Sequence, residues 1–323
     1  MRSFIIGKND AGQRLDKFLS KAVPRLPAPL MHKYLRLKRI KLNRKRCENA
    51  TRLCEGDVLE LYIGDEFFSE AAQENAFLLA PNDLNILYED ENVLLADKPP
   101  GLIVHEDERE AVDTLINRIQ RHLYERGEYD PSKENSFAPA LCNRIDRNTG
   151  GIVIAAKNAE ALRILNEKIK SREVHKYYLC IVHGIPEQKS GTLTAYLKKD
   201  SEQNRVTVRT APFCDAKLIK TRYRVMATAD DHALLEVELL TGRTHQIRAH
   251  LSFIGHPLVG DTKYGTNRQN KGSGHRFQAL YSYRLAFRFT QDGGSLSYLN
   301  GREFTVENVW FATKFSGQFG QRS

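Results

Sequence analysis

The segment NRIDRNTGGIVIAA, residues 143–156, joins a polar loop holding one carboxylate to an apolar run. The run Ile152 to Ala156 is typical of a strand buried inside a sheet. In the loop, Asp146 has arginines at positions 144 and 147. Nearby cations favour the charged form of a carboxyl group, so we expect Asp146 to be ionised and to act as a nucleophile or base. An ordinary ion pair is the commoner explanation for such an Asp taken alone.

The sequence on either side of this segment predicts many strands and few helices. Two strands joined by an acidic turn are expected after Ile86, then a helix that Asp113 caps, and a helix at 158–170. Further strands are expected at 152–156, 177–182, 205–209, 221–225, 234–240 and 283–289. This pattern indicates an α+β domain built on a largely antiparallel or mixed β-sheet with flanking helices.

A second polar cluster follows the strand expected at 234–240. The segment TGRTHQIRAH, residues 241–250, predicts a helix that Thr244 caps and Gly255 ends. Its polar side chains are Arg243, His245, Gln246, Arg248 and His250. A helix N-terminus of this kind suits an anion, either a phosphate or a carboxylate such as Asp146. The histidines lack the spacing of a helical zinc pair, so no metal site is predicted.

A third candidate segment is VHKYYLCIV, residues 174–182. In a strand, Lys176 and Tyr178 share one face while Tyr177 lies on the other. Tyr178 is then either an ordinary core aromatic residue or a surface on which a nucleobase stacks.

Positive charge is concentrated near the N-terminus. The 323 residues include 49 Lys and Arg against 40 Asp and Glu, a net of +9, and residues 1–65 hold 15 against 7. No acidic residue lies between Asp16 and Glu48, and the second half of this interval is crowded with cations: Lys33, Arg36, Lys38, Arg39, Lys41, Arg44, Lys45 and Arg46. A solvated helix face normally mixes signs, so we interpret this stretch as a surface for RNA phosphates.

Length and composition suggest two domains. We expect an α/β RNA-binding domain at 1–65, a linker at 66–83, a catalytic domain at 84–315 and a flexible tail at 316–323. In the first domain, helices are expected from Leu15 and over Leu30 to Leu37, with prolines breaking the chain between them. No apolar run is long enough for a membrane span, and the N-terminus does not resemble a signal peptide, so a cytoplasmic location is expected.

Two resemblances add to these expectations. Residues 12–63 resemble the S4-type RNA-binding domain through RLDKFL at 14–19, a basic turn at 41–45 and Gly56-Asp57. Residues 84–312 resemble the RluA family of pseudouridine synthases, whose H-R-L-D-x-x-T-S-G loop, K-x-Y strand and T-G-R-x-H-Q-I-R-x-H helix start match the three segments above. Together the resemblances imply an RNA isomerase that modifies large-subunit ribosomal RNA or a ribosomal precursor, without metal or cofactor.

The second resemblance also implies roles for single residues. Asp146 is the catalytic aspartate, Arg248 pairs with it, Tyr178 packs on the target uracil, and Arg144 helps to replace the flipped base. Substrate-binding residues are further expected to be Lys176, Arg243, His245 and Gln246. The carboxylate attacks either the sugar or the base, and the target uridine is single-stranded or flipped out of its helix.

Three positions depart from the family's pattern, and two of them are in the loop around Asp146, which is expected to border the incoming RNA. Asn143 replaces His, Gly150 replaces Ser, and Tyr281 replaces His. The basic segment 267–276 is either an RNA contact or a surface loop without a role.

The sequence also allows other functions. The rivals are a non-catalytic RNA-binding or ribosome-assembly protein, a tRNA-directed synthase, and a nucleosidase or nuclease that uses Asp146. A nuclease normally clusters metal-binding carboxylates, and few acidic residues lie near Asp146. Nothing in the sequence requires more than a monomer.

Overall fold

The computed structural model describes residues 1–68, 76–107, 110–200, 202, 205–271, 274–313 and 315. These residues form a four-stranded sheet near the N-terminus and an eleven-stranded sheet in the rest of the chain. No helix among them is long and apolar enough to cross a membrane. The expected tail at 316–323 lies outside the described residues, as does part of the expected linker, 69–75.

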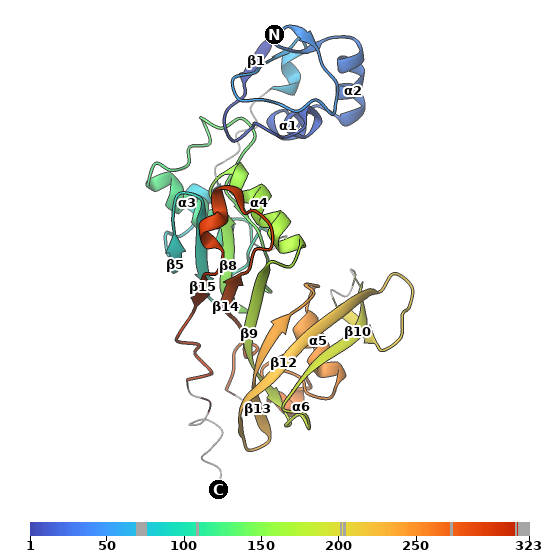
Figure 1. Cartoon of the computed structure of the whole chain (residues 1–323), viewed down its shortest axis with the longest axis vertical. Coiled ribbons are helices and arrows are strands. Elements are labelled where there is room, and N and C mark those ends of the chain that lie inside the picture. The colour runs from blue at the N-terminus through green and yellow to red at the C-terminus, as the bar shows by residue number, and fades with distance from the viewer. Residues whose placement is uncertain are drawn as a thin grey trace.

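Residues 1–68, here called the N-terminal domain, pack two helices against a small sheet at one end of the molecule (Figure 1). The elements are β1 (Arg2–Ile5), α1 (Leu15–Ala22), α2 (Ala28–Arg36), β2 (Ile40–Leu42), β3 (Lys45–Arg46), β4 (Val58–Leu61) and the 3-10 helix η1 (Asp65–Phe67). Leu15, Phe18 and Leu19 line the buried face of α1, as their spacing predicts.

Two expectations for this domain are wrong in detail. The second helix begins earlier than predicted, because Pro27 is its N-cap and Pro29 lies in its first turn, where the missing amide hydrogen costs nothing. The strands β1 and β3 were not predicted, since each is too short for alternation to stand out.

The remaining residues, here called the main domain, are organised around the large mixed sheet. Its strands are β5 (Ile86–Glu89), β6 (Val93–Lys98), β7 (Ala140–Leu141), β8 (Gly150–Ala156), β9 (Val174–His183), β10 (Ser190–Asp200), β11 (Arg205–Arg209), β12 (Lys217–Ala229), β13 (His232–Leu239), β14 (Leu280–Phe287) and β15 (Glu303–Thr305). The order is β11-β10-β12-β13-β9-β14-β8-β6-β5, with β15 on β14 and β7 on β8. Among the described pairs only β14 and β8 run parallel, so the predicted mixed sheet is confirmed.

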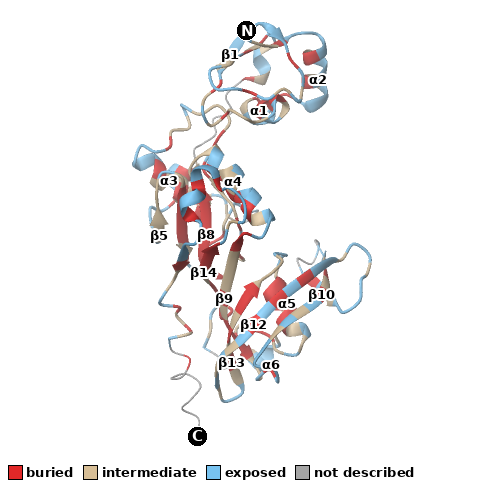
Figure 2. Cartoon of the chain, viewed as in Figure 1, coloured by how far each residue is buried: buried red, intermediate tan, exposed pale blue. Residues whose placement is uncertain are grey.

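Helices cover both faces of the central strands (Figure 2). The helices are α3 (Leu115–Glu125), α4 (Ala159–Lys170), α5 (Gln246–Phe253) and α6 (Asn267–Asn270), with 3-10 helices η2 (Ala76–Leu79) and η3 (Gly294–Leu299). In β8, Val153 and Ala155 belong to one core with α3, whereas Ile152 and Ile154 belong to another with α4. The strand is therefore buried on both faces, which explains its unbroken apolar sequence.

Several local expectations for the main domain need correction. Thr114, not Asp113, caps α3 and accepts a hydrogen bond from the amide of Asn117. His245, not Thr244, is the N-cap of α5, and it adopts a left-handed φ of 52°. The strand β10 was not predicted, and part of the segment expected as a loop at 267–276 is the helix α6.

The two domains meet through polar contacts. The carboxylate of Asp10, which is 1% exposed, accepts hydrogen bonds from Asn135 Nδ2 (2.7 Å) and Ser136 Oγ (2.6 Å) of the main domain. Asn9 Oδ1 accepts from the amide of Ala159 in the first turn of α4 (3.1 Å), and Arg163 Nη1 donates to the carbonyl of Ala11 (2.7 Å). These contacts fix one orientation of the N-terminal domain.

A candidate active site around Asp146

A cavity of about 760 Å³ opens in the main domain where the loop before β8 faces β9 and the start of α5. All eight residues expected at the catalytic and substrate-binding positions line it: Arg144, Asp146, Lys176, Tyr178, Arg243, His245, Gln246 and Arg248. Their segments are far apart in the sequence, and the pairing of β9 with β13 and β14 brings them together. The sequence therefore predicted the composition of this cavity, although the role of each residue remains a prediction.

The carboxylate of Asp146 is held from the opposite wall by Arg248. Arg248 Nη1 donates to Asp146 Oδ2 at 2.7 Å, and Asp146 Oδ1 takes no hydrogen bond from the described residues. The rest of the guanidinium is used by Asp261, which accepts from Nε (2.7 Å) and from Nη2 (2.9 Å). Such a two-point contact fixes the plane of the guanidinium. Asp146 is thus aimed with one oxygen left for a substrate.

The ion pair of Asp146 comes from a residue distant in sequence, not from the arginines beside it. Arg147 turns away and donates from Nε to the carbonyl of Gly101 (3.0 Å). Arg144 is exposed and lines the cavity. The hydrogen-bonded cation of Asp146 is therefore Arg248, and of the two flanking arginines the structure ties Arg147 elsewhere.

Asp261 was not predicted as a site residue from the sequence. It is 0% exposed, and burial opposes its ionisation. The hydrogen bonds from Arg248 and from backbone amides outweigh that effect, so the pKa of Asp261 lies below its usual value. Tyr264 was missed as well, and its ring lies 5.3 Å from the guanidinium carbon of Arg248. A buried carboxylate and an aromatic ring thus orient Arg248 from behind.

The turn before α5 is held by Gln246. Its Oε1 accepts from Thr241 Oγ1 (2.9 Å) and from the amide of Arg243 (3.1 Å). Its Nε2 donates to the carbonyl of Lys220 and to Thr221 Oγ1, both at 3.0 Å. All four bonds stay within the protein, so this geometry favours a support for the turn over the substrate contact expected from the sequence.

The two histidines of this segment have different surroundings. His245 Nε2 lies 3.9 Å from Asp146 Oδ2, and its Nδ1 lies 2.8 Å from Tyr264 Oη. Burial lowers the pKa of His245 and so favours its neutral imidazole, against the attraction of the nearby carboxylate. His250 is 1% exposed and hydrogen-bonds Thr221 Oγ1 at 3.0 Å, which is the behaviour of a core histidine.

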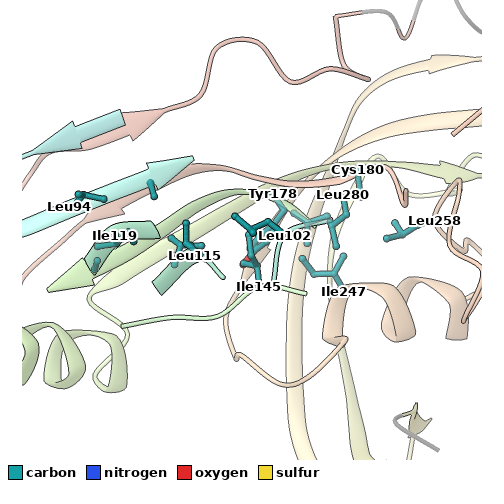
Figure 3. Close-up of a cluster of buried hydrophobic side chains, with 14 of the residues drawn as sticks. Leu94, Leu102, Leu115, Ile119, Ile145, Tyr178, Cys180, Ile247, Leu258 and Leu280 are labelled. Atoms are coloured by element: carbon teal, nitrogen blue, oxygen red, sulfur yellow. The ribbon is translucent and has the colours of Figure 1, made fainter. Parts of the chain in front are cut away.

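Tyr178 and apolar side chains form the inner wall of the cavity. Figure 3 shows Tyr178 in a row of buried side chains with Leu102, Ile145, Ile247 and Leu280. Burial raises the pKa of Tyr178 to about 12, and the charge of Asp146 adds to this effect. The phenol therefore stays neutral at physiological pH and is suited to packing on a planar base rather than to removing a proton.

A buried lysine, Lys98, is hydrogen-bonded to the backbone of the Asp146 loop. Lys98 is 0% exposed, and its Nζ donates to the carbonyls of Pro99 (2.9 Å), Leu102 (2.7 Å) and Arg147 (2.9 Å). The amide of Gly101 also donates to the carbonyl of Arg147 (2.8 Å). Burial lowers the pKa of Lys98 to about 7, against the attraction of Asp146. The turn after β6 thereby fixes the residue next to Asp146.

The cavity suits an anionic, planar ligand. Arg144, Lys176, Arg243 and Arg248 surround the single carboxylate of Asp146. Burial lowers the pKa of Lys176 to about 8, so its ammonium remains largely charged at pH 7. The cations expected between Lys33 and Arg46 are all in the N-terminal domain and do not line this cavity.

Comparison with known proteins connects this geometry to a described family. The family model for RNA pseudouridylate synthase matches residues 92–253, which include Asp146, Tyr178 and Arg248. An uncharacterised RNA pseudouridine synthase of Mycoplasma genitalium is 36% identical over 291 residues, covering 88% of each chain. A ribosomal large subunit pseudouridine synthase C of Vibrio cholerae is 32% identical over 273 residues, covering 81% of this chain and 80% of that one.

The fold has a solved counterpart as well. Human RNA pseudouridylate synthase domain containing 4 matches with a TM-score of 0.56 at 20% identity, over 73% of this chain and 93% of that one. At this identity the likeness supports the fold of the main domain.

Proposed function

The chain belongs to the RNA pseudouridylate synthase family, and on that premise we propose that it converts uridine to pseudouridine in large-subunit ribosomal RNA with Asp146 as its catalytic carboxylate. Membership makes it an isomerase that acts on RNA. The observation that carries the assignment of Asp146 is its position, held by Arg248 at the rim of a cavity whose inner wall is Tyr178.

The chemistry needs a carboxylate and a base held against it. The bond between N1 of uracil and C1′ of ribose breaks, the uracil turns, and C5 bonds to C1′. The hydrogen at C5 leaves as a proton and N1 gains one, so atoms and electrons balance without an oxidant. Asp146 attacks either C1′ or the base, and Tyr178 packs on the ring while it turns. The target nucleotide reaches this depth only when it is unpaired or flipped.

The choice of large-subunit RNA rests on two supports. Two relatives are named as ribosomal large subunit enzymes, synthase C of Vibrio cholerae and synthase D of Neisseria meningitidis, the latter 29% identical over 298 residues. The second support is an N-terminal domain that we assign as S4-like and RNA-binding. Its basic run lies along α2 and the β2–β3 hairpin, where Lys38, Asn43 and Arg44 have positive φ and shape tight turns.

The protein is proposed to act as a monomer, since the cavity of a single chain already contains Asp146, Tyr178 and Arg248.

The test is a map of pseudouridine in defined RNAs. Large-subunit rRNA and total tRNA, both transcribed without modification, are incubated with the purified protein without added metal. Pseudouridines are then located by carbodiimide modification and primer extension. We expect new pseudouridine at one or a few positions of the rRNA. Pseudouridine only in tRNA would overturn the proposed target, and none in any RNA would overturn the activity.

A further inference from the structure

A second concentration of positive charge lies in the main domain, next to the cavity. From Lys189 to Arg224 there are nine Lys and Arg against three Asp and Glu, a net of +6. Residues 1–65 carry +8 and the whole chain +9, so all other residues together carry −5. The net charge of the main domain is therefore close to zero only because the positive segment and the negative remainder cancel. Its excess of positive charge lies in the lobe formed by β10, β11 and β12, which Figure 1 places on the far side of β9 from the N-terminal domain.

The outer face of this lobe is largely neutralised. Arg222 Nη1 lies 2.8 Å from Glu238 Oε2, and Arg224 Nη2 lies 2.9 Å from Glu236 Oε1. Cross-strand pairs of this kind stabilise a sheet surface and leave little charge for a ligand. This face gives no reason to expect an anionic partner.

The inner edge of the lobe is different. Leu197 is buried against Ala249 of α5, and it pairs in register with Lys217. Lys199 follows Leu197 by two positions and so lies on the same face of β10. Lys199, Lys217 and Arg243 are all exposed, and none of their side chains has an acidic partner among the described residues. Three cations with uncompensated charge thus meet where the lobe faces the start of α5.

These cations continue the wall of the cavity. Lys199, Arg243 and Thr244 line the cavity that holds Asp146, and the same three residues line an adjoining hollow of about 410 Å³ with Lys217. A long ligand that extends out of the cavity on this side would therefore pass Arg243 and Lys199 and then Lys217. The one carboxylate of that hollow, Asp215, lies 3.8 Å from Lys198 and is turned to that cation.

We propose that Lys199, Lys217 and Arg243 form a phosphate track, which binds the sugar–phosphate backbone of the nucleotides next to the uridine held in the cavity. The assignment rests on the proposed function, because it takes RNA as the occupant of the cavity. Exposed cations on a surface continuous with the site supply affinity through release of counterions, without reading sequence. Figure 1 places the N-terminal domain and the lobe that holds most of the track on opposite sides of the central strands, so a substrate that uses both extends across the main domain.

The test compares two double variants of the full-length protein. Lys199→Ala with Lys217→Ala removes two cations of the track. The control, Lys189→Ala with Lys220→Ala, removes the same charge from exposed positions at the far end of β10 and on the outer face of β12. All four side chains are exposed, so neither variant disturbs the core. Binding to a transcript of large-subunit rRNA is measured against salt concentration, and release of tritium from carbon 5 is measured separately.

We expect the slope of log Kd against log salt to fall by about 1.4 to 1.8 in the track variant, the value for two lost phosphate contacts, and to stay unchanged in the control. The KM for RNA should rise while kcat is retained. Equal slopes in the two variants would overturn the track. A wild type that binds with the expected slopes but releases no tritium would leave the track as an RNA surface and overturn the proposed function.

Discussion

The guanidinium of Arg248 donates hydrogen bonds to two carboxylates, those of Asp261 and Asp146, whose surroundings differ. Asp261 is buried and takes two of its hydrogen bonds, whereas Asp146 is partly exposed and takes one. Asp261 does not line the cavity, so its effect on a substrate passes through Arg248. It is a positioning residue, and the orientation of Asp146 depends on it.

Replacing Asp261 by Asn tests that dependence. Asn keeps the size of the side chain but loses the charge and one acceptor, so Arg248 is held less firmly. Because misplacement of a catalytic group by about 1 Å costs roughly 100-fold, we expect kcat to fall by about 10- to 100-fold. The KM for RNA should change little, and thermal unfolding should show a folded protein. A rise in KM with kcat unchanged would contradict the positioning role.

Two departures from the family's pattern compensate one another. A Cβ at Gly150 would clash with the ring of Tyr281, whose Oη donates to Asp97 Oδ1 at 2.6 Å. Glycine at 150 and tyrosine at 281 therefore form a matched pair, in which the ring occupies the space of the missing side chain. The altered pair lies where β14 runs parallel to β8, just after the Asp146 loop.

Gly150→Ser alone should overfill this contact and cost about 1–3 kcal/mol of the free energy of unfolding. Combined with Tyr281→His, which removes the large ring, the same substitution should cost clearly less than the sum of the single changes. Denaturant unfolding of the four proteins measures the coupling. Additive costs would show that the two positions are independent.

At the scale of elements, the sequence predicted those with strong periodicity. The strands β8, β9 and β13 and the helices α3 and α4 are confirmed, because each has a long apolar face against the core. The short strand β11 is confirmed as well, and its alternation places Val206 and Val208 against the core. The strand β10 was missed even though Leu193, Ala195 and Leu197 alternate with polar residues. Threonine, glycine and lysine at its exposed positions resemble loop composition, and only pairing with β12 makes the strand evident.

In the site too, residues that act through contacts between distant segments could not be predicted from the sequence. Its residues were predictable because three motifs carry them, but Asp261, Tyr264 and Lys98 act through contacts that join distant segments. No local pattern distinguishes such residues from ordinary polar ones. Likewise, the pairing of Asp146 with Arg248 was suggested by the resemblance and not by proximity in sequence, where Arg144 and Arg147 are closer.

A buried ion pair at the end of α4 should make the stability of the protein depend on pH. Lys168 Nζ lies 2.9 Å from Glu173 Oε2, and both residues are buried. This hydrogen bond lowers the pKa of Glu173 to about 2, below its value in the unfolded chain. The pair thus contributes its full stability above about pH 4.5, and that stability is lost as the pH falls toward 2.

The Tm of the wild type should therefore approach that of Glu173→Gln as the pH falls from about 4.5 to 2, since the glutamine does not titrate. Calorimetry of both proteins over this interval measures the difference. A Tm difference that stays constant would mean that the pKa of Glu173 is not depressed.

For the whole molecule, the polar contact between the domains sets where the basic run lies relative to the cavity. Asn135 and Ser136 come from the long loop after α3, and both donate to Asp10. That loop is thus the docking site of the N-terminal domain. Under the proposed function, a fixed orientation lets the basic run and the cavity bind two distant parts of one RNA.

Changing Asn135 and Ser136 together to Ala should release the N-terminal domain without unfolding either part, because both side chains lie at the contact and outside the cores. We expect the radius of gyration from X-ray scattering to rise. Pseudouridine formation should fall more on full-length rRNA than on a short fragment around the target. The control changes Ser132 and Lys133, which belong to the same loop, to Ala. Identical scattering from all three proteins would refute the fixed docking.

The most direct test of the central claim is single-turnover release of tritium from carbon 5 of uridine in labelled large-subunit rRNA. Wild type is compared with Asp146→Asn and with a control, Asp113→Asn. The carboxylate of Asp113 does not line the cavity, and its Oδ1 lies 2.7 Å from Arg118 Nε. We predict release by the wild type and by Asp113→Asn. For Asp146→Asn we predict a loss of at least about 1000-fold, with RNA binding retained, because the amide keeps the shape without the nucleophilic charge. Full release by Asp146→Asn would contradict the account.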